Sequence, residues 1–209
     1  MSEPKIGRLV VASLHQAIAE ALPLKLDFYE NWLKPLGLLN QGRVIGAASF
    51  SAALSFLRRE EPRETYNDIT RRAGQLAAIW TVDSLSWTRR RWLKMLPTRM
   101  RIRASLRLAR EIARAAYPGS RIAFRLHKEG GTIEVRGSVF CQVREKVDRP
   151  LCGFYEGVIV QLMEMHGIHG EVRMSRCRAS GGGSCQMQLF WDSSRAPAPT
   201  AARQGVVAE

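Results

Sequence analysis

The hydrophobic period of this sequence first changes at the segment Tyr117–Ser120. Before this segment, apolar residues recur at every third or fourth position, which is typical of amphipathic helices. After it, the alternating stretches Ile122-Phe124-Leu126 and Ile133-Val135 indicate two strands, and the glycines between them predict a hairpin turn. The chain therefore combines a helical first half with a second half that contains strands.

Helical spacing in the first half predicts helices over 8–22, 49–60, 64–95 and 98–117. Pro23 ends the first of these, and Pro97 marks the end of the third. A further apolar segment, 27–39, is interrupted by proline and glycine.

The second half continues with a helix and another hairpin. Residues 149–167 return to helical spacing, and the alternating segments 169–179 and 184–191 are joined by a glycine-rich turn. The order is helices, hairpin, helix, hairpin, which predicts an α+β fold with N-terminal helices packed on a small antiparallel sheet. We expect a helical arm over 1–40, a main domain over 41–192 and a disordered Pro/Ala-rich tail over 193–209.

The chain is strongly basic, with 32 Lys and Arg against 19 Asp and Glu, a net charge of +13 over 209 residues. This charge favours anionic partners. Residues 88–114 carry much of the excess, including a row of arginines at helical spacing: Arg99, Arg103, Arg107, Arg110 and Arg114. The row could bind carboxylates or phosphates, or it could be a solvated helix face.

The expected compartment decides how the cysteines are interpreted. The N-terminus lacks the pattern of a signal peptide, and no uncharged apolar run is long enough to span a bilayer. We therefore expect a cytoplasmic protein, in which clustered thiols indicate metal binding or chemistry more often than disulfides.

All four cysteines lie in the last third of the chain: Cys141, Cys152, Cys177 and Cys185. Their spacing is not that of a zinc knuckle. The predicted elements nevertheless bring them close, because Cys177 and Cys185 flank the second hairpin turn and Cys152 starts the preceding helix. Two interpretations stay open: the thiols pack as small apolar side chains, or they bind a structural metal ion in a tetrahedral site.

The order of Cys152, Phe154–Val158, Cys177, a glycine-rich turn and Cys185 resembles the 4-vinyl-reductase domain family, and Gly137–Cys141 is similar to its preceding segment. These are small ligand-binding modules related in fold to TRAPP-type trafficking subunits. Members include phenol- and toluene-sensing domains of bacterial activators and an accessory protein of bacteriochlorophyll synthesis. The resemblance covers about 120–191.

The resemblance implies a zinc site, because the sensors bind zinc with three cysteines and one glutamate. The cysteines correspond to Cys152, Cys177 and Cys185, and Met174 stands where the family has glutamate. The candidates to complete the site are Cys141, then Glu156 and Glu171. Four protein ligands would make such an ion structural, without an open position for a substrate.

No catalytic set or dinucleotide-binding motif is present in the sequence, so we expect a binding function rather than reductase activity. Aromatic and basic residues could line a pocket between the helices and the sheet. The candidates are Trp80, Trp87, Trp92, Phe124, Phe140, Phe154, Tyr155, Arg103, Arg107 and Arg110. For each aromatic residue the alternative is core packing.

Three functional hypotheses follow. The first is a non-catalytic binding protein for an apolar, aromatic or tetrapyrrole-like molecule, an accessory or carrier in bacteriochlorophyll-type pigment synthesis. The second is a basic regulatory or scaffolding module that binds nucleic acid or an acidic protein through 89–114. The third is self-association, since proteins that the domain resembles often dimerise through helices and the apolar helix 8–22 could form a homodimer surface.

Overall fold

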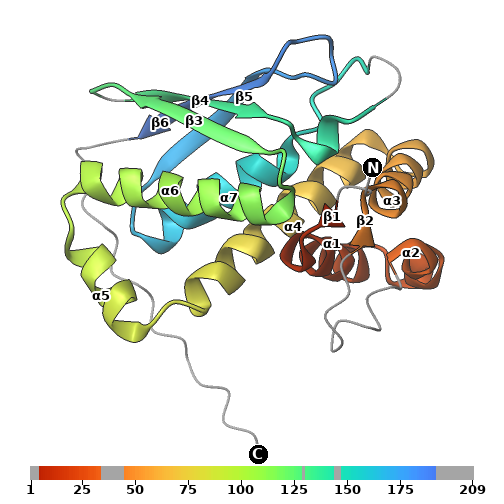
Figure 1. Cartoon of the computed structure of the whole chain (residues 1–209), viewed down its shortest axis with the longest axis horizontal. Helices are drawn as coiled ribbons and strands as arrows, with labels where there is room; N and C mark the ends of the chain where they lie inside the picture. Colours follow the sequence, from red (N-terminus) through yellow and green to blue (C-terminus); the bar gives the residue numbers. More distant parts are fainter. Residues whose placement is uncertain (1–4, 34–44, 129, 144–146, 192–209) are drawn as a thin grey trace, which may run out of the picture.

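The computed structural model describes residues 5–33, 45–128, 130–143 and 147–191. The described residues form an α+β fold in the predicted order of helices, hairpin, helix and hairpin (Figure 1). The helices are α1 (Arg8–Ala21), α2 (Leu26–Leu33), α3 (Ala47–Glu60), α4 (Arg63–Asp83), α5 (Trp87–Met95), α6 (Thr98–Ala116) and α7 (Gly153–Met165). The strands are β1 (Lys5–Ile6), β2 (Ile45–Gly46), β3 (Arg121–Leu126), β4 (Gly130–Arg136), β5 (Gly170–Arg176) and β6 (Cys185–Trp191).

The main sheet is antiparallel, with the strand order β3-β4-β6-β5. Its two hairpins meet through β4 and β6, where Ile133 lies opposite Met187 and Val135 lies opposite Cys185. Alternate residues of β4 and β6 are buried, as the period of two in the sequence predicts. Helices α6 and α7 cover this buried face, and the other face is open (Figure 1).

Helix α7 lies between the sheet and α4, so it is apolar on most of its circumference. The α4–α7 crossing is close because both helices present glycines to it. A Cβ atom on Gly157 would lie 2.1 Å from the carbonyl oxygen of Arg71, and one on Gly74 would lie 2.0 Å from that of Phe154. The glycine of the "FYEGV" stretch therefore serves helix packing.

Helix α1 belongs to the same hydrophobic core as the rest of the domain. Its residues Val10, Leu14 and Ile18 are buried, and α1 packs along α4. The backbone N–H of Gly7, just before α1, donates to the carbonyl of Ala116 at 2.8 Å. The apolar face that could form a dimer surface is thus already covered within the chain. The predicted boundary at residue 40 and the predicted tail lie outside the described residues.

The prediction of one helix over 64–95 is wrong. Helix α4 ends at Asp83, and α5 begins at Trp87 with Ser86 as its N-cap residue. The Ser86 side chain accepts a hydrogen bond from the backbone N–H of Arg89, which favours a new helix start over continuation. The apolar spacing runs through this break, so periodicity alone did not show it.

Within the described ranges, no single helix has the length and hydropathy needed to cross a membrane. One bent pair, Arg8–Ala21 with Pro23–Leu33 at 118°, meets the criteria of length and composition only when taken together.

Candidate metal centre

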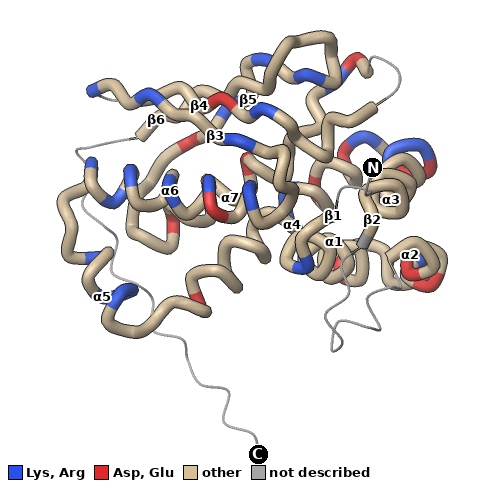
Figure 2. Tube along the Cα trace, in the orientation of Figure 1, with Lys and Arg blue, Asp and Glu red and all other residues tan. Residues whose placement is uncertain are grey.

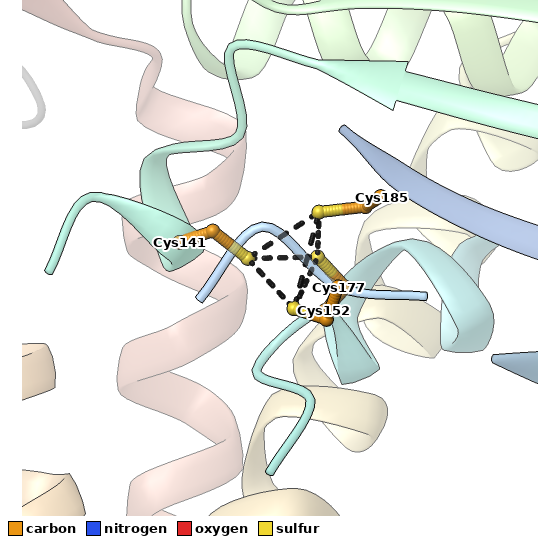
Figure 3. Close-up of side chains that lie close together, drawn as sticks. All are labelled: Cys141, Cys152, Cys177 and Cys185. Carbon is orange, nitrogen blue, oxygen red and sulfur yellow. Dashed lines mark hydrogen bonds between the residues drawn. The ribbon is translucent and has the colours of Figure 1, made fainter. Parts of the chain in front are cut away.

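The four cysteines come from four separate parts of the second half of the chain (Figure 3). Cys141 ends a short 3-10 helix, Val139–Cys141, which follows the first hairpin. Cys152 is the N-cap residue of α7, Cys177 directly follows β5, and Cys185 is the first residue of β6. Each thiol therefore lies at or next to the end of a helix or strand.

The four sulfur atoms converge on one point. The six Sγ–Sγ separations run from 2.9 Å, between Cys141 and Cys152, to 4.0 Å, between Cys177 and either Cys152 or Cys185. All four side chains are buried, and all four are free thiols rather than disulfides. The expectation that these cysteines meet in space is confirmed.

This geometry fits a tetrathiolate metal site. With a Zn–S distance of about 2.3 Å, the sulfurs of a regular tetrahedron lie about 3.8 Å apart, within the range of the separations described above. Thiolates are ligands that zinc prefers, and a closed set of four is typical of structural rather than catalytic zinc. When bound, the ion would supply the positive charge that keeps four thiolates together.

The fourth member of the cluster is Cys141 rather than a carboxylate. Glu156 accepts a hydrogen bond from Arg71 at 2.8 Å, and Glu171 is paired with Arg173 on β5. Met174, at the position of the family's glutamate, faces Met187 across the β5–β6 pair. Among the described residues, the ligand atoms that lie within 4.8 Å of one another here are the four sulfurs alone.

Backbone N–H groups donate hydrogen bonds to two of the four sulfurs, which favours the thiolate form of these two cysteines. The N–H of Leu151 donates to the sulfur of Cys177 at 3.4 Å, and the N–H of Arg178 donates to that of Cys185 at 3.4 Å. Hydrogen bonds with the other three cysteines lower the pKa of Cys177, whereas the neighbouring sulfurs and burial raise the pKa of Cys152. Four thiolates packed this closely would repel one another, so a cation is needed to hold all of them ionised.

Aromatic side chains form the apolar wall beside the thiols. The rings of Phe140 and Phe154 stack with their centroids 4.8 Å apart, and Phe50 and Tyr155 contact Phe140 edge-on. The Tyr155 hydroxyl lies 3.2 Å from that of Ser120. The predicted ligand residues Phe140, Phe154 and Tyr155 are thus buried core residues.

A second group of predicted ligand residues lies between α6 and β3. Arg110 donates to the carbonyl of Ile122 at 3.0 Å, and its guanidinium stands 5.0 Å from the centroid of the half-buried Phe124 ring. Arg103 lines a hollow of about 240 Å³ with Leu126 and Trp191, near the end of β3. Arg107 is exposed.

The remaining predicted residues belong to α4 and α5. Trp80 is half-buried against the core. Trp87 and Trp92 on α5 are 65% and 60% exposed, respectively. The predicted ligand residues are therefore distributed over three regions: the core beside the thiols, the α6–β3 contact and the α4–α5 corner.

The structure also brings together polar residues that sequence reasoning did not select. His166, the C-cap residue of α7, is buried against Ser105 of α6 and lines a hollow of about 410 Å³ with residues of α4 and α5. In the sequence these residues are far apart. The one local signal is the position of His166 before Gly167, where the preceding helix ends.

Neither a family model nor a curated protein matches this sequence. Solved structures with a similar fold include the phenol-responsive sensory domain of the transcription activator PoxR, at 11% identity and a TM-score of 0.53, covering 70% of this chain and 75% of that domain. A mutant H-NOX protein from S. oneidensis in the Fe(II) ligation state matches at 12% identity and a TM-score of 0.51, covering 88% of this chain and 95% of the other. At these identities the likeness shows a shared fold.

Proposed function

We propose that this protein is a small-molecule-binding domain without catalytic activity, stabilised by a structural zinc ion on Cys141, Cys152, Cys177 and Cys185. The single observation that carries the metal assignment is the convergence of four buried sulfurs from four chain segments. Four free thiols at these separations are costly to pack as ordinary core residues, because their protons and lone pairs crowd one another. A divalent cation removes this cost.

The similarity in fold to a phenol-responsive sensory domain supports the binding function. That domain is the sensory part of a transcription activator. A metal centre that joins the sheet to α7 would give such a module a rigid frame, because the ion would link Cys141 and Cys177 to the start of the central helix.

The resemblance to the 4-vinyl-reductase family supports a finer proposal. The ligand would be apolar, aromatic or tetrapyrrole-like, and the protein would be an accessory or carrier protein in bacteriochlorophyll-type pigment synthesis. Trp87, which lines a hollow of about 410 Å³, supports an apolar ligand, since aromatic side chains are common in pockets for flat molecules.

Metal analysis tests the first part of the proposal. The purified full chain is expected to contain about one zinc ion per molecule, and removal with a strong chelator should lower the thermal midpoint by several degrees. Re-addition of zinc should restore the midpoint. Metal-free protein with an unchanged midpoint after chelator treatment would refute the structural role.

Ligand titration tests the second part. Tryptophan fluorescence of the zinc-loaded protein is measured with phenol, with larger flat aromatic compounds and with a chlorophyllide-type pigment. A saturable response to at least one of them is expected. No response to any would exclude an apolar-ligand function and would leave the metal assignment standing.

A further inference from the structure

A hollow of about 410 Å³ lies where the C-terminal ends of α4 and α7 meet α5. Apolar and basic side chains both line it. The apolar ones are Val82, Trp87 and Met165, and the basic ones are Arg90, Arg91, Lys94 and His166. The one carboxylate among the lining residues is Asp83, so the charge of the hollow is positive. Figure 2 shows the basic residues gathered on α5.

His166 lines this hollow and contains a buried ring nitrogen that has no hydrogen-bond partner among the described residues. The residue is only 3% exposed, and its Nδ1 atom lies 2.7 Å from the hydroxyl of Ser105. Its Nε2 atom has no hydrogen-bond partner among the described residues. Leaving such an atom buried and unpaired costs free energy, which a hydrogen bond from a ligand would recover.

The tautomer of His166 can adapt to a ligand without a change in charge. The Ser105 hydroxyl lies 3.0 Å from the carbonyl oxygen of Arg101 and 2.7 Å from Nδ1 of His166. When Ser105 donates its proton to Nδ1 instead of the carbonyl, the imidazole proton resides on Nε2. The ring then offers an N–H donor to the hollow.

Two arginines add further unpaired donors close to His166. The Nε atoms of Arg90 and Arg101 are both buried without a partner in the described part of the chain. Arg101 donates through Nη1 to the carbonyl of His166 at 2.8 Å, which fixes its guanidinium beside the histidine. Arg90 donates to Asp83 at a long distance of 3.4 Å, and both side chains are partly exposed, so this ion pair is weak.

We propose that this hollow binds the carboxylate or phosphate group of a small aromatic molecule. His166 and Arg90 would donate to the oxyanion, Lys94 would balance its charge, and Trp87 with Met165 would contact the apolar part. The volume suits a molecule of benzoate size. The inference rests on the proposed small-molecule function and adds the chemical class of one ligand group.

The aromatic and basic residues on α5 raise the alternative of an anionic lipid surface, since Trp87, Trp92 and Met95 are exposed. The unpaired donors favour a small ligand instead, because Nε2 of His166 is buried and a flat bilayer surface cannot reach it. Vesicles of anionic lipid therefore form a separate arm of the test.

Isothermal titration of the full chain with benzoate, with benzamide as its neutral analogue, and with inorganic phosphate tests the inference. Benzoate is expected to bind at least about tenfold more tightly than benzamide, because hydrogen bonds to a charged acceptor are stronger than hydrogen bonds to a neutral one. Arg90→Gln should weaken benzoate binding by about tenfold. Phosphate should compete with benzoate.

The matched control is Arg89→Gln, which removes the same charge from the neighbouring exposed position of α5, outside the lining of the hollow. It should leave benzoate binding unchanged, and the thermal midpoints of both variants should match that of the parent. His166→Leu, checked in the same way, should also weaken binding. Equal affinities for benzoate and benzamide, or equal effects of Arg89→Gln and Arg90→Gln, would overturn the inference.

Two further outcomes separate the inference from the proposed function. Binding of phenol without binding of benzoate would overturn the inference and leave the proposed function intact. Binding to anionic vesicles that Arg90→Gln weakens, without benzoate binding, would replace the small-ligand site by a lipid surface.

Discussion

Cys152 and His166 cap the two ends of the same helix, α7, as its N-cap and C-cap residues. At a rise of about 1.5 Å per residue, the 13 residues between them separate the two positions by roughly 20 Å. One end of the helix therefore carries the thiol cluster, where the helix dipole favours negative charge. The other end carries the buried histidine, so the candidate metal site and the proposed anion site are distinct and share one rigid element.

The identity of the fourth metal ligand can be tested by substitution. Cys141→Ser should weaken zinc binding by at least about tenfold, because the other three sulfurs cannot close a tetrahedron. Glu156→Gln should leave the zinc content unchanged, since this carboxylate pairs with Arg71 instead. Zinc affinity measured by chelator competition distinguishes the two, and loss of zinc in Glu156→Gln alone would assign the carboxylate as a ligand.

The α4–α7 contact should be sensitive to a single methyl group. Gly157→Ala would place Cβ 2.1 Å from the Arg71 carbonyl oxygen, which forces the helices apart. We expect a loss of about 1–3 kcal/mol in the free energy of unfolding, measured by urea denaturation. The control is Gly183→Ala, where a Cβ atom would meet nothing within 4 Å, and it should change the free energy by less than about 0.5 kcal/mol. Similar losses in both variants would contradict the close crossing.

A buried carboxylate should depend on one lysine. Glu61 is nearly buried and accepts hydrogen bonds from Lys25 at 2.8 Å and from Tyr29 at 3.0 Å. Lys25→Met should cost about 1–3 kcal/mol of stability, because it leaves the carboxylate without its cation. The exposed Lys128→Met serves as the control and should have little effect in the same urea titration. Equal stabilities of the two variants would show that Glu61 does not need this partner.

The stability of the protein should fall in mild acid because of His166. Burial, together with the cationic Lys94 and Arg101, lowers the pKa of His166 below its ordinary value of 6.5. Below pH 6.5 the unfolded chain binds a proton that the folded protein does not, so stability decreases as the pH falls toward the folded pKa. Above pH 6.5 this contribution is constant. The charged groups around the histidine are Arg90, Arg91, Lys94, Arg101 and Asp83. Of these only Asp83 would favour its protonation, and the backbone carbonyl of Leu162 acts in the same direction without outweighing burial.

His166→Gln should therefore reduce the dependence of the thermal midpoint on pH between 7 and 5. His127→Gln, at an exposed histidine, is the control and should leave this dependence unchanged. An identical pH profile in the parent and in His166→Gln would contradict the depressed pKa.

The arginine row on α6 offers a test of the nucleic-acid alternative. Arg103 and Arg107 are exposed, whereas Arg110 binds the carbonyl of Ile122 and so stabilises the α6–β3 contact. If the row binds phosphates, changing Arg103 and Arg107 to Ser should make DNA binding less dependent on salt. The slope of the logarithm of the binding constant against the logarithm of the salt concentration should become shallower by about 0.9 for each phosphate contact that is lost. Under this alternative we expect the parent protein to bind DNA weakly and without sequence preference. The double variant should contain as much zinc as the parent. Unchanged DNA affinity in the double variant would exclude this row.

Several features of the fold could be predicted from local sequence patterns. The change of period after Ser120, the hairpin turns and the glycine at the end of α7 act over a few residues, so α6, α7 and the four strands were predicted correctly in type and order. The predicted hairpin placed Cys177 and Cys185 close together, because the pairing of β5 with β6 sets which of their residues lie opposite each other. The break at Ser84–Ser86 was missed because the apolar spacing continues through it.

The sequence by itself determined the order of helices and hairpins in the second half and that the cysteines lie at their ends, because period, turns and caps are local properties of the chain. Only the tertiary structure decided that Cys141 joins the other sulfurs, that Phe140 and Phe154 are core residues and that His166 and Arg90 line the same hollow. These relationships depend on how α4, α5 and α7 pack. Packing depends on many weak contacts between residues that are far apart in the sequence, and a local sequence pattern does not show which of these residues meet.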